Sequence, residues 1–342
     1  LISPFRGNSS FLMDRLGTVL HRWSSAESTL MGYLREDGSV VRSIVTGADN
    51  GITIGGKTGA IEIIDKDNNQ IWKWTLDSST EALHHDIALM PNGHILASVW
   101  VVKDRATCIA NGRDPNSIVA DRLVIDKVIE IEPVGTDQAN IVWEWSLWDH
   151  LVQDFDASQL NFGDASNGSL FDINQSTEGD NFTHVNGLDY IPSLDQIILN
   201  SRVLDEFIII DHNTTTAEAA SNSDNQDDPN FSTVKEININ VTVDGVYDAI
   251  PSAGNSPSSP IWSYSSDEIY SPRTSGAQRL ASGNTLITSN SGDIIREVNY
   301  ENEVLWEFDA RIAVDGVLEI NSSGFKSRSY EKNYSGVTAL GL

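Results

Sequence analysis

The sequence contains a single cysteine, Cys108, among 342 residues, so no disulfide can form within the chain. It also has no apolar run of about 18 residues, which excludes a membrane-spanning helix. Basic residues are scarce, with 22 Lys and Arg against 49 Asp and Glu and a formal net charge of −27. Such a surface repels nucleic acid and anionic membranes, so neither is an expected partner. Any anion site in this chain therefore needs local positive groups.

Amphipathic helical periodicity is almost absent. Short alternating or apolar runs are separated by Asn-Gly, Asp-Gly and Gly-Asn, a pattern typical of an all-β fold. Two pieces recur, an apolar hairpin such as LMPNGHIL (89–96) and a Trp-ended hairpin such as IEIIDKDNNQIWKW (61–74). Two hairpins in tandem make a four-stranded unit that buries its faces by stacking against further units, as in a β-propeller. The tryptophans are expected to pack between these blades.

We expect a single propeller domain over residues 1–342. Direct counting of the repeats predicts five blades, with one Trp-ended hairpin split between FIIIDHN (207–213) and PIWSY (260–264). The N-terminal hairpin has no preceding partner and the C-terminal segment has no following one, so we expect the two ends to close the ring as one blade. Rim insertions at about 148–180 and 213–258 interrupt the repeat.

One stretch, NFTHVNGLDYIPSLDQIILNSRVLDEFIIIDH (181–212), concentrates groups that can hold an oxyanion. His184 and Asn186 are two residues apart, so on an extended strand their side chains point to the same side. Arg202 ends the next apolar run and returns beside them if the two runs pair as a hairpin. Its partner would be either a structural carboxylate or a bound anion, because a buried charge needs one.

The ordered set HHDIALMPNGHIL, WEWSLWDHLVQDFD, HVNGLDYIPSLDQIILNSR, IIIDHNTTTAEAA and SGAQRLASGNTLI resembles the arylsulfotransferase family. The resemblance covers nearly the whole chain and implies a periplasmic or secreted propeller of six blades, which we favour over five. It also implies a ping-pong reaction, in which a histidine takes the sulfuryl group from an aryl sulfate and passes it to a phenol. Such a reaction needs a nucleophile and donors that stabilise spread negative charge, and no cofactor.

Residue by residue, the resemblance assigns His85 and His184 as catalytic candidates, and Asn186 and Arg202 as substrate-binding candidates. Asp86 follows His85 and is able to orient an imidazole or to cap a turn. His84 is a poor alternative nucleophile, because alternation along a strand would direct it to the opposite face from its neighbour.

The sequence departs from the family at the nucleophile. The family's nucleophilic histidine lies five residues before the leucine of its last L-P-N-G-N motif. Here that leucine is Leu280, in LASGN, and Ser275 stands five residues earlier, with Arg273 nearby as a further substrate-binding candidate. No histidine follows His212. Ser275 is the catalytic candidate at this position only if a neighbouring base activates it.

Nine Asn-x-Ser/Thr sequons indicate a secreted, extracellular glycoprotein if the source is eukaryotic. The candidate glycosylation sites are Asn8, Asn167, Asn174, Asn181, Asn213, Asn230, Asn240, Asn321 and Asn333. An acidic loop with Asp224, Asp227 and Asp228 has carboxylates suited to Ca²⁺, but their spacing fits no EF-hand, and a solvated loop is the favoured interpretation. No other metal is expected.

Three functions stay open. The chain is an active sulfotransferase with a rearranged nucleophile, a binding module for an aryl sulfate or sulfated glycan, or a structural glycoprotein that assembles as a homo-oligomer or filament. We favour a retained oxyanion pocket with sulfuryl transfer altered or lost.

Overall fold

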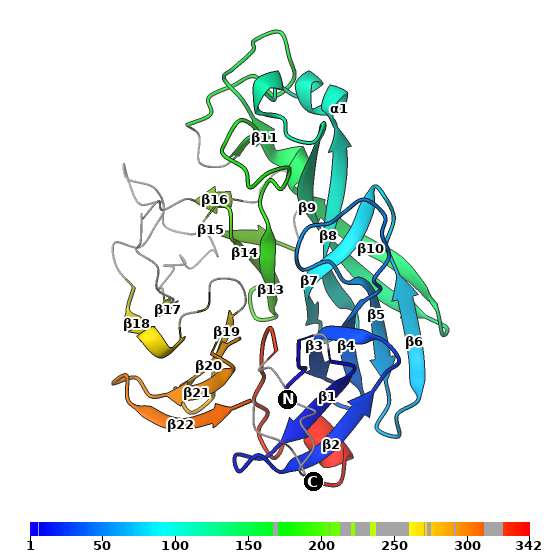
Figure 1. Cartoon of the computed structure of the whole chain (residues 1–342), viewed down its shortest axis with the longest axis vertical. Coiled ribbons are helices and arrows are strands. Elements are labelled where there is room, and N and C mark those ends of the chain that lie inside the picture. Colours follow the sequence, from blue (N-terminus) through cyan, green and yellow to red (C-terminus); the bar gives the residue numbers. More distant parts are fainter. Residues whose placement is uncertain are drawn as a thin grey trace.

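The computed structural model describes residues 1–5, 7–166, 170–204, 206–212, 220–222, 233–236, 260–269, 271, 275–290, 292–310 and 324–342. Strands dominate these residues and form small, mostly antiparallel sheets arranged as a β-propeller (Figure 1). The predicted all-β propeller is therefore confirmed.

Four of the sheets have four strands each, and every one is an antiparallel meander in chain order. They comprise β3 (Ser28–Leu34), β4 (Val40–Val45), β5 (Gly59–Ile64) and β6 (Gln70–Thr75); β7 (Glu81–Leu89), β8 (Ile95–Asp104), β9 (Arg122–Val134) and β10 (Gln138–Ser146); β13 (Val185–Ile191), β14 (Gln196–Ser201), β15 (Glu206–Asp211) and β16 (Ala220–Asn222); and β19 (Ser275–Arg279), β20 (Thr285–Ser289), β21 (Ile294–Val298) and β22 (Val304–Asp309). The two recurring sequence pieces are the first and second halves of such a sheet.

The remaining strands form two-stranded sheets. These pair β1 (Ser9–Met13) with β2 (Val19–Ser24), β11 (Leu151–Val152) with β12 (Phe171–Asp172), and β17 (Thr233–Glu236) with β18 (Trp262–Ser265). The described helices are α1 (Arg105–Ala110), α2 (Ser335–Ala339) and the 3₁₀ turns Pro115–Ser117, Leu147–His150 and Asp267–Ile269. No helix in this part of the chain has the length and apolar character needed to cross a bilayer. With four complete sheets described, the count of six blades stays a prediction.

The split hairpin is a correction to the sequence-based interpretation. Strand β15 pairs with β16, and β18 pairs with β17, so FIIIDHN and PIWSY do not form one hairpin. Both new partners come from the segment interpreted as the 213–258 insertion. A strand closes a short loop at a smaller entropic cost than a long one, which favours the nearby partner. Strand β16 has only three residues, Ala220–Asn222, with no apolar alternation, so the sequence pattern did not reveal it.

The hydrophobic core lies between neighbouring sheets. One cluster joins β4 and β5 to β8 and β9 through Val41, Ile61, Ile95 and Ile129, and a second joins β8 and β9 to β13–β15. Trp72 of β6 is 3% exposed, and its indole nitrogen donates to the Gln138 carbonyl of β10 at 2.8 Å. This tryptophan therefore packs between blades, as its repeat position predicts.

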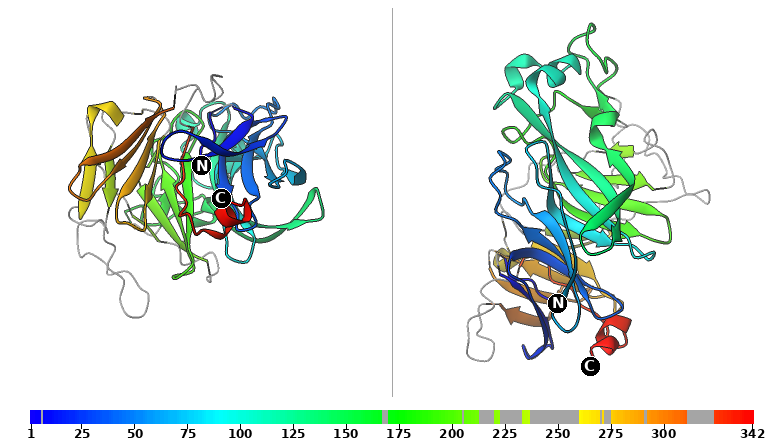
Figure 2. Two further views of the ribbon diagram at one scale, coloured as in Figure 1. Left: turned by 90° about the horizontal axis from the view of Figure 1, so that it is seen from below. Right: turned by 90° about the vertical axis from the view of Figure 1, so that its right-hand side faces the viewer.

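The two ends of the chain meet. The Leu1 amino group donates to the Arg328 carbonyl at 2.6 Å, and the Arg328 N–H returns to the Leu1 carbonyl at 3.0 Å. Tyr330 and Tyr334 bind the backbone of Leu34 at the end of β3. The views in Figures 1 and 2 agree that both termini lie beside β1–β3. Residues 324–342 contribute these contacts and α2, and the rest of the predicted closing blade, 311–323, lies outside the described residues.

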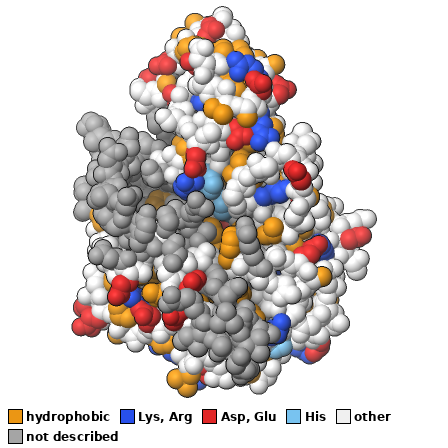
Figure 3. Space-filling model, viewed as in Figure 1, with side chains coloured by type: hydrophobic (Ala, Val, Ile, Leu, Met, Phe, Trp, Pro, Cys, Tyr) orange, Lys and Arg blue, Asp and Glu red, His pale blue; other side chains and the backbone are white. Residues whose placement is uncertain are grey.

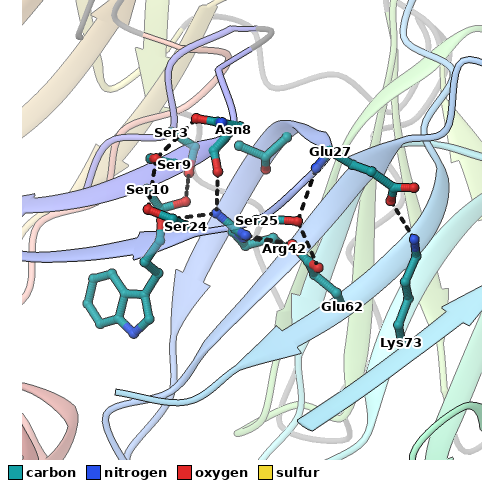
Figure 4. Close-up of polar contacts among 12 residues, drawn as sticks. Ser3, Asn8, Ser9, Ser10, Ser24, Ser25, Glu27, Arg42, Glu62 and Lys73 are labelled. Carbon is teal, nitrogen blue, oxygen red and sulfur yellow. Dashed lines mark hydrogen bonds and ion pairs between the residues drawn. The ribbon is translucent and has the colours of Figure 1, made fainter. Parts of the chain in front are cut away.

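A fully buried ion pair holds the first complete blade together (Figure 4). The side chains of Arg42 on β4 and Glu62 on β5 are both 0% exposed. Arg42 Nε and Nη2 donate to Glu62 Oε1 at 3.1 and 2.6 Å, and Nη1 donates to the Trp23 carbonyl at 3.2 Å. The guanidinium thus joins β4 to β5 and to the N-terminal hairpin.

Glu62→Leu is expected to lower the free energy of unfolding by about 3–5 kcal/mol, because it leaves the Arg42 guanidinium buried without its counter-ion. Lys73→Met is the control, since it breaks a half-exposed pair with Glu27 and is expected to cost less than about 1 kcal/mol. Urea unfolding measures both. A Glu62→Leu variant as stable as Lys73→Met would contradict the prediction.

Candidate functional site

Two bulged strands bring His85 and His184 together. Strand β7 shifts register between Leu83 and Ile87, and β13 shifts between Val185 and Gly187. Both histidines have left-handed backbones, with φ of 44° and 51°, a conformation that is uncommon outside glycine and that collects at functional sites. Their ring centroids lie 4.9 Å apart. Two of the catalytic candidates therefore lie side by side.

The bulge in β7 also brings His84 into the site. Its Nδ1 lies 3.0 Å from Nδ1 of His85, its Nε2 lies 2.9 Å from Oδ1 of Asp126 on β9, and its ring stacks on Trp100 of β8 at 4.3 Å. Rejection of His84 from the sequence rested on regular strand alternation, which the bulge removes. For the same reason, alternation does not place His184 and Asn186 on one side.

Asn181 completes the cluster, a role that sequence reasoning missed. Its side-chain nitrogen lies 2.5 Å from Nδ1 of His184, and the residue is 2% exposed. This burial makes the nitrogen inaccessible to glycosylation in the folded chain. The N-F-T tripeptide suggested a glycosylation sequon. The sequence signal for contact with His184 was that Asn181 lies three residues before it.

Several buried polar atoms of the cluster have no hydrogen-bond partner among the described residues. They are Nε2 of His84, Oδ1 of Asp126, Oδ1 of Asn181 and Nε1 of Trp100. The 2.9 Å approach of His84 to Asp126 is an ion-pair distance without hydrogen-bond alignment. Buried polar atoms that lack partners are costly, and their concentration at one point indicates a place that water or a ligand completes.

Arg202 lies at the rim of the cluster. The predicted hairpin is confirmed, since β13 pairs with β14 and the Arg202 N–H donates to the His184 carbonyl at 3.1 Å. The Arg202 side chain is 40% exposed, and its guanidinium donates hydrogen bonds to both carboxylate oxygens of Glu178, one of them at 3.0 Å. Asn186 is half-buried, without a side-chain hydrogen bond to a described residue. On the face shown in Figure 3, a histidine reaches the surface near the middle, beside a basic and an acidic side chain.

Ser275 is not arranged as a nucleophile. It is the first residue of β19, is exposed, and pairs along the backbone with Ser289. Its hydroxyl makes no hydrogen bond to a described residue, so none of these residues acts as its base. Arg273 lies outside the described residues.

Burial and neighbouring charges keep both central histidines neutral at pH 7. Burial holds the pKa of His85 well below its usual range, and the neighbouring cationic or protonatable side chains His84, His184, Arg202 and Lys326 lower it further. Burial and the Arg202 charge lower the pKa of His184 to about 4, against a smaller opposing effect of Asp126. Each neutral imidazole has one N–H and one basic nitrogen. At His184, Nδ1 faces the Asn181 amide, which leaves Nε2 for a ligand; at His85, Nδ1 faces His84 and Nε2 packs against Gly56.

Asp86 connects the cluster to the C-terminal segment. Its carboxylate accepts from the Tyr33 hydroxyl at 2.6 Å and from the Leu188 N–H at 3.0 Å, and it pairs with Nζ of Lys326. Sequence reasoning noted Asp86 but missed Lys326, because the GFKSRSY segment carries no motif and lies about 140 residues after the H-x-N stretch.

Other parts of the described chain offer less chemistry. Two open hollows of about 670 and 300 Å³ lie on the outer side of the first blade, and no histidine lines either of them. Burial raises the pKa of the Cys108 thiol to about 11, so this residue is not a thiolate nucleophile. Within the described residues, no three His, Cys, Asp or Glu side chains are arranged to hold a metal ion. Asp224, Asp227 and Asp228 lie outside them.

The molecule is thus a β-propeller with neutral histidines clustered where two blades begin. A model of the family Arylsulfotransferase (ASST) matches residues 7–218, and the chain belongs to this family. The match includes His85, His184, Asn186 and Arg202, and ends before Ser275. A search of curated proteins found no match.

Several solved structures are similar at low identity. Apo AztD from Citrobacter koseri is 10% identical, with 93% of this chain and 95% of that chain covered and a TM-score of 0.35. Virginiamycin B lyase from Staphylococcus aureus is 12% identical, with 92% and 86% covered and a TM-score of 0.31. A protein of unknown function from Bacteroides caccae is 8% identical, with 91% and 72% covered and a TM-score of 0.34.

The depressed pKa of His184 predicts acid sensitivity. Its pKa is about 4 in the folded chain against 6.5 for a free histidine, so between these values the unfolded chain binds the extra proton. Unfolding free energy should therefore fall as pH drops from 6.5 to 4, with about 3 kcal/mol of the loss due to His184. His184→Gln should show a correspondingly smaller loss in denaturation at several pH values. An NMR titration midpoint for His184 near 6.5 would contradict this.

Proposed function

We propose that this chain binds aryl sulfate esters at the histidine cluster, and that sulfuryl transfer through a histidine at position 275 is lost. The observation that supports the binding most directly is the pair of facing, neutral histidines on strained backbones, His85 and His184. Membership of the arylsulfotransferase family supports aryl sulfates as the ligand class.

The chemistry of the site suits a sulfate ester. An ester sulfate has one negative charge spread over three oxygens. These oxygens are very weak bases, so they accept hydrogen bonds from neutral imidazole N–H groups without taking the proton. Arg202 provides a planar fork of donors at the rim, provided that it exchanges Glu178 for the ligand. The amide of Asn186, half-buried on β13, is a further candidate donor. These groups are the local positive and polar partners that an anion needs in a chain of net charge −27.

The proposed loss of sulfuryl transfer follows from the residue at position 275, which is a serine. In the route that the family resemblance implies, an imidazole nitrogen attacks sulfur while the bond from sulfur to the aryl oxygen breaks, and the phenolate leaves with a proton from an acid. Ser275 has a poorly nucleophilic hydroxyl without a base among the described residues, and a guanidinium such as that of Arg273 does not attack.

A second function is active transfer with a rearranged nucleophile. The specific observation in its favour is the low pKa of His85 and His184, which leaves a basic ring nitrogen on each at neutral pH. In this alternative, one of the two attacks sulfur while the bond from sulfur to the aryl oxygen breaks, and the phenolate leaves and takes its proton from water.

We further propose that the protein is secreted and glycosylated. Asn8 and Asn333 are exposed, as glycan acceptors must be. Asn174 is half-buried and its side-chain nitrogen donates to the Gly112 carbonyl at 2.9 Å, so it is a weaker acceptor. Asn167, Asn213, Asn230, Asn240 and Asn321 lie outside the described residues. A role as an assembled surface or filament subunit also depends on this extracellular location.

Calorimetry with p-nitrophenyl sulfate tests the binding. Wild type should bind, and His184→Leu and Arg202→Gln should each weaken Kd by about tenfold or more, about 1.4 kcal/mol, because the first removes an N–H donor and the second removes a positive charge. Arg105→Gln is a matched control, since Arg105 is also 40% exposed and paired with a carboxylate. Absence of binding by wild type would remove the proposal.

Release of p-nitrophenol in the presence of a phenol acceptor tests the transfer. Wild type should give no turnover, and Ser275→His should introduce it by restoring an imidazole at the family's nucleophile position. Turnover by wild type that His85→Gln or His184→Gln abolishes would instead establish the rearranged nucleophile.

Mass spectrometry of the protein secreted from a eukaryotic host tests the location. Glycans are expected on Asn8 and Asn333 and not on Asn181, whose side chain is buried. An occupied Asn181 in folded protein, or unmodified Asn8 and Asn333, would contradict the proposal.

A further inference from the structure

The C-terminal segment Gly324–Arg328 runs to the histidine cluster from a distant part of the sequence. Phe325 is 3% exposed, and its ring centroid lies 5.8 Å from that of His85. The backbone bonds between Arg328 and Leu1 anchor the segment. In Figure 1 this red segment passes between the orange sheet β19–β22 and the blue N-terminal strands.

The side chain of Lys326 passes close to two glycines, and one of them, Gly276, makes room for it. A Cβ added to Gly276 of β19 would lie 2.6 Å from Cγ of Lys326, so no larger residue fits there without moving the lysine. A Cβ on Gly187 of β13 would lie 3.7 Å from its Nζ. Gly187 follows the H-x-N motif directly and Gly276 follows Ser275 directly. Lys326 therefore passes beside both the motif and the position of the missing nucleophile.

The ammonium group of Lys326 has donors left for a ligand. It pairs with Asp86, whose carboxylate already accepts hydrogen bonds from the Tyr33 hydroxyl and from the N–H groups of Ile87 and Leu188. One N–H directed at Asp86 leaves two more, and the lysine side chain is 17% exposed whereas that of Asp86 is 0% exposed. The Lys326 charge also lies near enough to His85 to contribute to its lowered pKa.

We propose that Lys326 is a ligand-binding residue, which donates from Nζ to a sulfuryl oxygen of an aryl sulfate held at the histidine cluster. This inference rests on the proposed function, and it adds the C-terminal segment to the site. Arg202 and Lys326 then offer two cations from different parts of the chain, one a planar fork at the rim and the other a compact point charge beside position 275.

The test must separate ligand binding from the ion pair with Asp86. Lys326→Met alone would leave the Asp86 carboxylate buried without its counter-ion and would destabilise the fold. Asp86→Asn/Lys326→Met removes both charges together and is the informative variant. Lys326→Arg keeps the charge, and Lys73→Met removes a paired lysine on the outer strand β6 as a matched control (Figure 4).

The experiment is the Kd of p-nitrophenyl sulfate at several NaCl concentrations, with Tm recorded for each variant. The double variant should bind at least about tenfold more weakly than wild type, with a shallower salt dependence, because one charged contact is lost. Lys326→Arg should recover most of the affinity, and Lys73→Met should match wild type.

Two results would overturn the role of Lys326. One is a folded double variant with wild-type Kd. The other is weaker binding with an unchanged salt dependence, which would indicate a positioning role only. Either result, with Arg202→Gln still weakening binding, leaves the proposed function standing, whereas absence of binding by wild type removes the proposed function itself.

Discussion

A single buried carboxylate, that of Asp86, ties together the parts of the chain that meet at the candidate site. It accepts hydrogen bonds from Tyr33 on β3 and from the backbone of β13, and it pairs with Lys326 of the C-terminal segment. A buried carboxylate is tolerated only with such partners, so the burial of Asp86 requires these elements to pack together. Asp86 follows His85 directly in the sequence. The bonds between Leu1 and Arg328 that hold the C-terminal segment in place therefore also help to position His85.

The left-handed backbone conformations of His85 and His184 are maintained by the packing around these residues. Gly56 has a φ of 96°, and a Cβ on it would lie only 2.0 Å from Nε2 of His85, so the loop before β5 fits against this imidazole only with glycine at that position. The resulting burial keeps both imidazoles neutral in a strongly acidic protein. An anion that enters the site meets N–H donors and the guanidinium of Arg202, while most other surface charges repel it.

The family match and the residues that decide the chemistry of the site cover different parts of the chain. The family match ends at residue 218, and it includes His85, His184, Asn186 and Arg202. Ser275 and Lys326, on which the question of transfer or binding depends, both lie beyond it. The family match therefore covers the residues that we propose to hold a sulfuryl group, and it does not cover position 275.

Local patterns in the sequence were enough to determine the all-β propeller, the β13–β14 hairpin and the inter-blade role of Trp72, because alternation and turn residues are short-range signals. They also singled out His184 and Arg202 as candidates, whereas His85 was a candidate only through the family resemblance. Only the tertiary structure decided that His84 and Asn181 join them, that β15 pairs with β16, and that Lys326 reaches the site. The reason is physical: bulges override strand alternation, and contacts between residues hundreds of positions apart depend on how the blades and the chain ends pack, which no local periodicity encodes.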